Sequence, residues 1–478
     1  MMAPHGGGAV SNEPSIYKED GNGGKGVVRI AIVAALGGFL FGYDSAVING
    51  AVSAVEQRFD VDPVSLGFAV ASALIGAAVG SLLAGRLADR VGRLSVMRIA
   101  AVLFLVSALG AGLAPALWVL VVFRIVGGLG VGMASVIAPA YIAEVSPAQI
   151  RGRLASLQQL AIVTGIFISL LVDFLLATAA GGSGAPLGGL EAWQWMFLAM
   201  AVPSLIYGGL SLTIPESPRY LIAQHRVSEA TVVLKKLTGG IHVETTVERI
   251  QESMERDTAP SWKDLMGRNG RIAGIVWVGL LLSIFQQFVG INVIFYYSNI
   301  LWEAVGFKEE QAFVITVISA TINILTTLIA IATVDRFGRK PLLIVGSIGM
   351  TITLATMAVI FGTAPVENGA PVLHGAAGPI ALVAANLFVV AFGMSWGPVV
   401  WVLLGEIFPN RMRAAALALA ASAQWVANWL ITVSFPGLKD ISLALAYGLY
   451  AAFALLSLLF VMRFVQETKG KSLEDMHA

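Results

Sequence analysis

Polar side chains gather inside an apolar stretch in the second half of the chain, at residues 285–297. Gln286, Gln287 and Asn292 carry amide groups, and Tyr296 and Tyr297 follow them. Burial of an amide in hydrocarbon without a hydrogen-bond partner costs several kcal/mol of free energy, so a neighbouring helix, water or a ligand must form hydrogen bonds with these groups. Amides donate and accept hydrogen bonds, as hydroxyl groups do, and the pattern therefore favours a neutral, hydroxyl-rich ligand.

Further amides lie in other apolar stretches. Asn323 is isolated in one of them, and Gln424 and Asn428 lie four residues apart, which places both on one face of a helix. Gln158 and Gln159 are adjacent, and they cannot both face the interior because neighbouring helical residues diverge by about 100°. Hydrogen bonds between helices, worth about 0.6 kcal/mol for each contact, are the alternative use of these amides.

Aromatic and helix-breaking residues accompany the amides. The ring faces of Trp401 and Trp425 are suited to stack on the C–H side of a sugar ring. Gly290, and Gly397 before Pro398, weaken their helices, so that part of each helix would bend over a bound ligand. The set contains no carboxylate. Because an amino acid would need charged partners and a polyaromatic drug a more apolar site, a sugar fits the set.

Two charged residues lie inside apolar stretches of the first half, Asp44 and Arg124. Charges within a membrane are costly and usually functional. A guanidinium favours the ionised carboxylate, so a motion that separates the pair would let Asp44 take up a proton. A static ion pair is the alternative. Asp173 lies near the outer end of another stretch, where we expect a solvated rim residue rather than a second titrating group.

The composition places these residues in a membrane. The 478 residues are 57% hydrophobic and 12% charged, whereas a soluble domain averages about 25% charged. The net charge of +1 indicates no nucleic-acid partner, and the lack of cysteine excludes disulfides and cysteine-bound metals. The sequence has no phosphate loop, no metal-spaced histidine cluster and no Ser-His-Asp arrangement. We therefore expect neither an enzyme nor a cofactor.

Twelve apolar stretches reach the roughly 20 residues that a membrane span needs. They are residues 28–53, 66–88, 95–115, 118–140, 154–179, 192–214, 271–301, 310–334, 341–362, 376–403, 414–436 and 442–465.

Lys and Arg cluster in one set of loops, which predicts that these loops and both termini are cytoplasmic. The polar stretch between the sixth and seventh spans would lie on the same side, with short amphipathic helices at 228–237 and 246–256. The expected organisation is a disordered tail at 1–27, a six-helix half at 28–214, a cytoplasmic helical linker at 215–270, a second six-helix half at 271–465 and a tail at 466–478.

Short charged motifs occur once in each half. Residues 89–93 return as 335–339, a Glu with an Arg seven residues later occurs at 144 and again at 406, and Glu216 has a counterpart in Glu467. Two halves in parallel orientation explain the repeats, as in transporters whose site lies between the halves. We interpret the motifs as a charge latch that closes the cytoplasmic end, with simple positive-inside anchoring as the alternative. The expected gating residues are Gly85, Arg86, Asp89, Arg90, Arg93, Glu144, Arg151, Glu216, Arg219, Asp335, Arg336, Arg339, Glu406, Arg413 and Glu467.

This combination of motifs resembles the sugar porter family of the major facilitator superfamily. The residues that carry the resemblance are 85–93, 215–219, 286–292, 335–340 and 467–470, and the similarity extends over about 28–476. The chain is most similar to bacterial proton-linked glucose and xylose porters, including actinobacterial glucose permeases. Gln466 and Leu94 depart from the family pattern, but both lie at the cytoplasmic rim, away from the predicted sugar site.

The resemblance implies an all-α membrane protein of the major facilitator fold, with twelve transmembrane helices. It implies sugar/H⁺ symport of D-glucose or a close aldose by alternating access, with Asp44 and Arg124 coupling the proton. It selects Gln159 over Gln158 and places most sugar contacts in the second half. The implied substrate-site residues are Phe41, Gln159, Gln286, Gln287, Asn292, Tyr296, Asn323, Gly397, Trp401, Gln424, Trp425 and Asn428.

Alternatives to this function share most of these residues. A passive sugar uniporter would differ only in coupling, a xylose- or galactose-preferring symporter only in specificity, and a sugar sensor on a transporter scaffold is a more distant possibility. The expected partners are a monosaccharide, protons and the lipid bilayer, and we expect a monomer.

Overall fold

The computed structural model describes residues 21–146, 151–238, 243–256, 265–266, 271–367, 370–409 and 412–469. Within these ranges, the side chains of 21–25, 151–153, 155–156, 238, 253–256, 335, 367, 370 and 413–414 are not described. Most of the expected N-terminal tail and part of the C-terminal tail lie outside the described residues.

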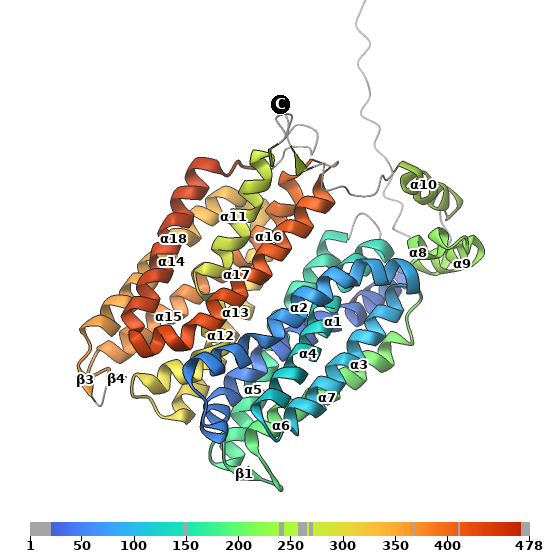
Figure 1. The fold of residues 1–478 in the computed structure, drawn as a ribbon. Coiled ribbons are helices and arrows are strands. Elements are labelled where there is room, and N and C mark those ends of the chain that lie inside the picture. The colour runs from blue at the N-terminus through green and yellow to red at the C-terminus, as the bar shows by residue number, and fades with distance from the viewer. Residues whose placement is uncertain are drawn as a thin grey trace, which may run out of the picture.

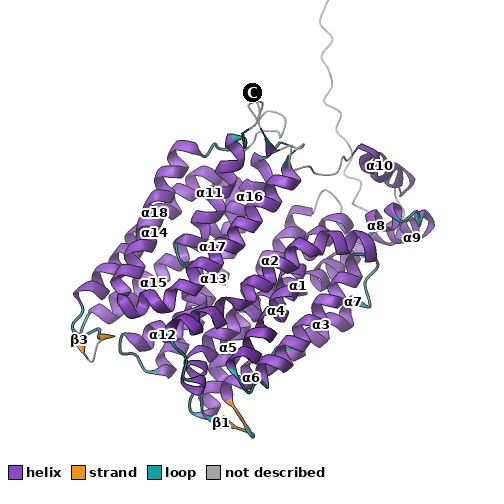
Figure 2. Cartoon of the chain, viewed as in Figure 1, coloured by secondary structure: helices purple, strands orange, loops and turns teal. Residues whose placement is uncertain are grey.

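The first half of the chain is a bundle of helices with one short hairpin (Figures 1 and 2). Its elements are α1 Gly21–Phe59, α2 Pro63–Val91, α3 Arg93–Gly112, α4 Leu117–Val145, α5 Arg151–Ala180, the antiparallel strands β1 Pro186–Leu187 and β2 Leu190–Glu191, α6 Ala192–Ala199 and α7 Ala201–Ser211.

The second half is also a bundle of helices with one short hairpin, here between the third and fourth spans of that half. Its elements are α11 Gly274–Phe288, α12 Ile291–Ala304, α13 Glu309–Phe337, α14 Arg339–Thr363, the antiparallel strands β3 Val366–Glu367 and β4 Ala370–Pro371, α15 Ala377–Gly393, α16 Trp396–Ile407, α17 Arg413–Ile441 and α18 Leu443–Phe464.

Eleven helical segments of the described chain are long and apolar enough to cross a membrane, counting α11 with α12 and α15 with α16 as one each. The twelfth expected span, at 192–214, is formed by α6 and α7, which are separated at Met200. Pro203 explains the interruption, because proline has no N–H and its ring clashes with the carbonyl four residues earlier, at Ala199.

The linker between the halves contains α8 Pro218–Ala223, α9 Val227–Thr238 and α10 Val243–Arg256. The amphipathic helices that we predicted at 228–237 and 246–256 are thus confirmed, with α9 and α10 starting earlier than the sequence suggested.

In the described structure the two halves meet mainly through α1 with α12, α2 with α17 and α5 with α13. Figure 1 shows the hairpins β1–β2 and β3–β4 at one end of the bundle, which we call the hairpin end. The linker helices α8 to α10 lie at the opposite end, which we call the linker end. The ribbons of the two halves lie close together toward the hairpin end and diverge toward the linker end.

Local sequence sets the helix boundaries at both ends. At the hairpin end α2 begins after Asp62, whose carboxylate accepts hydrogen bonds from the backbone N–H groups of Val64 and Ser65, with Pro63 at the first helical position. At the linker end Gly92 and Gly338, with φ of 95° and 93°, make the tight turns between α2 and α3 and between α13 and α14.

Candidate functional site

The amides of the second half form one hydrogen-bonded cluster. Gln286 of α11 donates from Nε2 to the carbonyl oxygens of Trp396 at 2.8 Å and Gly397 at 3.1 Å, both in α16. Its own Oε1 accepts from Gln424 of α17 and, at 3.4 Å, from Gln287. The cluster thus joins three helices of the second half through a single side chain.

Asn292 extends the cluster across the break between α11 and α12. Its Nδ2 donates to Gln287 Oε1 at 2.5 Å. Between the two residues, Gly290 has φ +83° and ψ 20°, a left-handed conformation that residues with a Cβ rarely adopt. A Cβ at Gly290 would also lie 2.7 Å from the ring of Tyr450 in α18. The glycine therefore permits both the turn and the close packing that bring Asn292 back to Gln287.

A second break positions the carbonyl groups that Gln286 meets. α15 ends at Gly393, and Ser395 has φ −136° and ψ −88°, outside helical geometry. Pro398 explains the position, because its ring would clash with the carbonyl of Met394, four residues earlier. The backbone is thus broken just before Trp396 and Gly397.

Helix α1 of the first half contributes to the same region. The rings of Phe41 in α1 and Trp425 in α17 lie with centroids 6.0 Å apart and an interplanar angle of 43°. Tyr296 of α12 lies within hydrogen-bonding reach of Ser45 in α1 and Asn428 in α17. The cluster is therefore adjoined by aromatic and polar side chains from both halves.

The remaining predicted substrate residues have other surroundings. Asn323 of α13 is buried beside Gly393, and Trp401 of α16 is 45% exposed. Gln159 is half-buried, whereas its neighbour Gln158 is only 8% exposed and packs against Gly38 of α1. The two glutamines therefore point in different directions, and a sugar role for Gln159, Asn323 or Trp401 stays a prediction.

Asp44 and Arg124 form a buried pair between α1 and α4. They are 1% and 2% exposed, and Arg124 Nη1 lies 3.6 Å from Asp44 Oδ2. The same nitrogen donates to the backbone oxygen of Asp44 at 2.7 Å, and Nη2 donates to Val70 O at 3.5 Å. The guanidinium is thus held mainly by carbonyl groups, and neither carboxylate oxygen has a hydrogen-bond partner among the described residues.

Tyr296 relates the predicted substrate residues to the charge pair. Tyr296, which reaches Asn428 in the second half, lies within electrostatic range of both Arg124 and Asp44. Ser45, its other neighbour, follows Asp44 in α1. A ligand that contacts Tyr296 would therefore lie within electrostatic range of the charge pair.

Asp173 was expected at a solvated rim, and this prediction is wrong. Its exposure is 0%, and it lies against the main chain of α1 at Gly50, where a Cβ would lie 2.6 Å from Asp173 Oδ2. The missing side chain at Gly50 lets α5 approach α1 closely enough to bury the carboxyl group.

At the linker end, the first half contains a charged network. Arg93 forms a two-pronged ion pair with Glu144, with Nε–Oε2 at 3.1 Å and Nη2–Oε1 at 3.0 Å. Glu216 accepts from the backbone N–H groups of Arg93 at 3.1 Å and Leu94 at 3.2 Å. Arg93 also reaches Asp89 at 3.2 Å.

The second half contains a matching network. Arg339 pairs with Glu406, with Nε–Oε2 at 3.0 Å and Nη2–Oε1 at 2.6 Å. Glu467 accepts from the backbone N–H groups of Arg339 at 3.0 Å and Lys340 at 2.9 Å. Burial acts to raise the pKa of Glu467, but four backbone N–H donors outweigh it and hold this pKa below its usual value.

Each of these bonds lies within the first half and the start of the linker, or within the second half. In this conformation the networks therefore stabilise each half separately. Of the other predicted gating residues, Gly85, Arg86, Arg90, Arg219 and Arg336 are exposed at the linker end. The side chains of Arg151, Asp335 and Arg413 lie outside the described residues.

Toward the hairpin end, hydrogen bonds join the two halves. Asn49 of α1 donates from Nδ2 to Phe295 O at 3.2 Å and accepts from the backbone N–H of Asn299 at 3.1 Å, both in α12. Ser53 donates to the Glu303 carboxylate at 3.3 and 3.2 Å. Sequence reasoning missed these residues, although Asn49 and Asn299 are amides in apolar stretches, the signal that identified the cluster.

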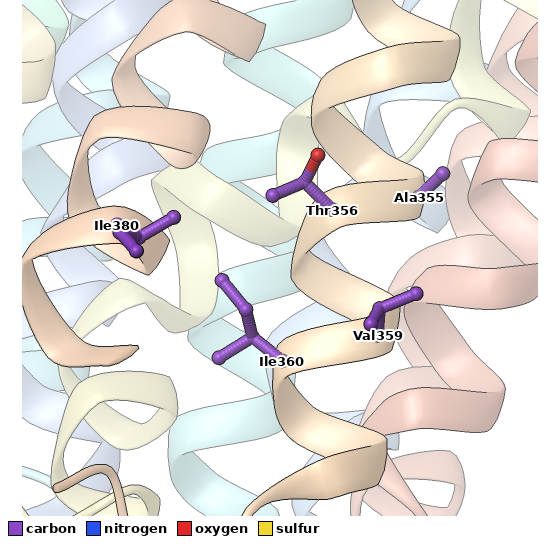
Figure 3. A pocket seen from close by; sticks show the side chains of 5 residues that line it. All are labelled: Ala355, Thr356, Val359, Ile360 and Ile380. Carbon is purple, nitrogen blue, oxygen red and sulfur yellow. The ribbon is translucent and has the colours of Figure 1, made fainter. Parts of the chain in front are cut away.

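An apolar groove lies apart from all of these residues, on α14 and α15 (Figure 3). It is lined by Ala355, Thr356, Val359, Ile360 and Ile380. The one polar side chain among them, Thr356, donates its hydroxyl to Ile352 O at 2.8 Å. The groove therefore lacks the amides that a hydroxyl-rich ligand would need.

Comparison with known proteins gives consistent results. A family model described as "Sugar (and other) transporter" matches residues 30–478. The glucose transport protein of Synechocystis is 57% identical over 455 residues, covering 95% of this chain and 97% of the relative. The D-xylose-proton symporter of Escherichia coli K12 is 39% identical over 489 residues, covering 95% of each chain.

Solved structures of the Escherichia coli xylose transporter are also similar. A partially occluded inward-open conformation has a TM-score of 0.80 and 38% identity, covering 94% of this chain and 100% of that one. A structure with bound 6-bromo-6-deoxy-D-glucose has a TM-score of 0.77 and 38% identity, covering 95% and 99%.

Proposed function

The chain belongs to the sugar transporter family, within the sugar porters of the major facilitator superfamily, and we propose that it imports D-glucose by sugar/H⁺ symport. It is a multi-pass membrane protein. The relative named a glucose transport protein and the relative named a D-xylose-proton symporter support the sugar and the coupling ion, respectively.

The observation that carries this proposal is a hydrogen-bonded amide cluster in the second half together with a buried charge pair in the first, with Tyr296 within electrostatic range of the pair. Gln286, Gln287, Asn292 and Gln424 present donors and acceptors that now satisfy one another. A sugar would replace these bonds with bonds to its hydroxyl groups, so little hydrogen bonding is lost on binding.

The charge pair supplies the coupling. Arg124 favours the ionised form of Asp44 while the two are together, and protonation of Asp44 becomes more favourable when Arg124 moves away. Tyr296 lies within hydrogen-bonding reach of Asn428 and within electrostatic range of the pair. Sugar binding at Tyr296 and protonation of Asp44 would therefore favour the same rearrangement of α1 against α12.

We assign the linker end to the cytoplasm, together with both termini, because Lys and Arg gather there. The hydrogen bonds from α1 to α12 then close the outer end, while the charged networks bond within each half. We interpret this arrangement as that of an inward-open carrier, and the similarity to the partially occluded inward-open xylose transporter supports this interpretation.

In the proposed cycle the outward-facing carrier has Asp44 protonated and binds the sugar at the amide cluster. α12 and α16, each preceded by a break, close over the sugar, and α1 engages α12 at the outer end. The halves then separate at the linker end, Asp44 returns to Arg124 and releases one proton inward, and the sugar follows.

Proteoliposomes test this proposal. Purified protein with an imposed inward proton gradient should accumulate labelled D-glucose above its outer concentration, and a protonophore should abolish the accumulation. Uptake that only reaches equilibrium would identify a uniporter and contradict symport. D-xylose and D-galactose measured in parallel establish the preferred sugar.

A further inference from the structure

Trp396 is a fully buried residue beside the amide cluster, and the proposed cycle gives its side chain no role. It is the first residue of α16, and its backbone oxygen accepts from Gln286 Nε2 at 2.8 Å. Its indole N–H donates to Ser347 Oγ at 2.9 Å and to Leu343 O at 3.2 Å, both in α14. One residue thus bonds α11 through its main chain and α14 through its side chain.

The hydroxyl groups of Ser347 and Ser457 continue this contact to α18. An indole N–H can only donate, so Ser347 Oγ is the acceptor from Trp396. Ser457 donates to Ala454 O at 2.7 Å, which leaves its oxygen to accept from the Ser347 hydroxyl at 3.0 Å. Each donor in this chain therefore has an acceptor, although all three side chains are 0% exposed. Buried polar groups that satisfy one another in this way fix one packing arrangement.

The break before α16 also lies tightly against α14. A Cβ at Gly346 would lie 1.8 Å from Ser395 Oγ, and Ser395 is the residue with non-helical dihedral angles at the break. The close approach therefore requires glycine at position 346. α14 packs on α18, and both helices lie on the side of the second half away from the first half (Figure 1). The break is thus held against the outer helices of its own half.

The position of the break determines how the Gln286 amide is oriented. A carbonyl oxygen can only accept, so the carbonyl groups of Trp396 and Gly397 select the orientation with Nε2 toward α16. Oε1 is then left to accept from Gln424. If the break moved away from α14, Nε2 would lose these acceptors and the amide could rotate. The cluster would then offer a sugar a different order of donors and acceptors.

We propose that Trp396 is a positioning residue for sugar binding, which anchors the break before α16 to α14 and so holds the Gln286 amide in its binding orientation. Trp396 acts through Gln286 and does not itself touch the sugar. Loss of the anchor should therefore weaken sugar binding only where Gln286 is present. This inference rests on the proposed binding of a sugar at the amide cluster, but it is independent of proton coupling.

Equilibrium binding of labelled D-glucose to the purified protein tests the proposal. Trp396→Phe keeps an aromatic ring and removes the indole N–H, and it should weaken binding about fivefold, the effect of one hydrogen bond. Gln286→Ala weakens binding by itself. If Trp396 acts through Gln286, the protein with both substitutions should bind sugar as tightly as Gln286→Ala alone, because the interaction that Trp396 supports is already absent.

Trp195→Phe is the matched control. Trp195 of α6 is partly buried, and its indole N–H donates to Leu187 O of β1 at 2.8 Å, at the hairpin end. The substitution removes the same atoms and one similar hydrogen bond. It should lower the melting temperature of the sugar-free protein by about as much as Trp396→Phe does, but it should leave sugar affinity at the wild-type value.

The outcomes separate this inference from the proposed function. If wild type binds none of D-glucose, D-xylose and D-galactose, the proposed function fails and the inference with it. If wild type binds a sugar and Trp396→Phe binds it equally well, the role of Trp396 is overturned while the proposed function stands. If Trp396→Phe weakens binding about fivefold further in the presence of Gln286→Ala, Trp396 acts independently of Gln286 and the inference is also overturned.

Ser347→Ala decides the case in which Trp396→Phe does not fold. It removes the hydroxyl group that accepts from the indole and leaves the indole ring and Leu343 O in place. It should weaken binding about threefold, as expected for one hydrogen bond between membrane helices, and again only where Gln286 is present. An unchanged affinity in Ser347→Ala would then overturn the inference.

Discussion

The first and second halves of the chain correspond closely at the linker end, where Glu216 in one matches Glu467 in the other. Each glutamate accepts from two consecutive backbone N–H groups at the start of a helix, beside an Arg–Glu pair. In Arg93–Glu144 and Arg339–Glu406 the same atoms of each side chain meet. These bonds are thus duplicated between the two networks.

Inside the membrane the halves differ. The first half places Asp44, Arg124 and Asp173 at buried positions of α1, α4 and α5, whereas the hydrogen-bonded amide cluster belongs to the second half. The difference indicates that the shared ends serve the motion common to both halves, while proton and sugar chemistry are divided between them.

The largest effect is expected from Asp44→Asn. Removal of the titratable group should reduce gradient-driven accumulation to the equilibrium level, because no proton then moves with the sugar. Accumulation and counterflow in proteoliposomes measure this directly. Uphill transport by the variant would show that the first half does not hold the coupling proton.

Gln286→Ala should have the next largest effect. It removes the side chain that joins α11, α16 and α17, and the loss of about 1–3 kcal/mol corresponds to an increase in KM of about 5- to 150-fold. At saturating sugar the proton-to-sugar ratio should stay at its wild-type value. A changed ratio would mean that the second half also takes part in coupling.

Glu216→Gln and Glu467→Gln should have smaller effects that match each other. Each removes a negative charge that accepts from two helix N-terminal amides, and each should lower the melting temperature by a few degrees and slow transport several-fold. Unequal effects would show that the two networks differ in function despite their matched geometry.

The pH dependence of stability sharpens the same comparison. Because the folded-state pKa of Glu467 is lowered, its contribution to stability is complete above the unfolded value near 4.5 and is lost as the pH falls through the lower folded value. Melting temperatures of wild type and Glu467→Gln should therefore converge in acid. If the melting temperatures of wild type and Glu467→Gln still differed at low pH, the stabilisation would not come from the ionised Glu467 carboxylate.

Asn49→Ala should have the smallest effect. Asn49 bonds Phe295 O and the N–H of Asn299, which are four residues apart and would form an ordinary helical bond with each other once Asn49 is gone. The substitution should destabilise the closed outer end by about 1 kcal/mol. The equilibrium between the inward-open and outward-open states should then shift about fivefold toward the outward-open state, which labelling at the hairpin end would measure. An unchanged labelling rate would show that Asn49 does not stabilise the closed outer end.

Much of this protein was predictable from the sequence. The apolar stretches fix the spans, the duplicated motifs fix the two halves, and residues 286–292 identify an amide-rich region, because polar side chains in hydrocarbon are rarely accidental. Proline positions also predict helix breaks. Pro398 accounts for the break near Met394, whereas Pro203 interrupts a span that we expected to be continuous.

Tertiary structure decided what composition could not. Asp173 is buried because Gly50 of a distant helix leaves room for it, and Gln286 meets Gln424 because two breaks bring three helices together. Asn49 finds its partners 246 and 250 residues away in the chain. The sequence determined which side chains are polar and which helices break, but the burial and bonding of each depend on close approach between helices, which only the folded bundle defines.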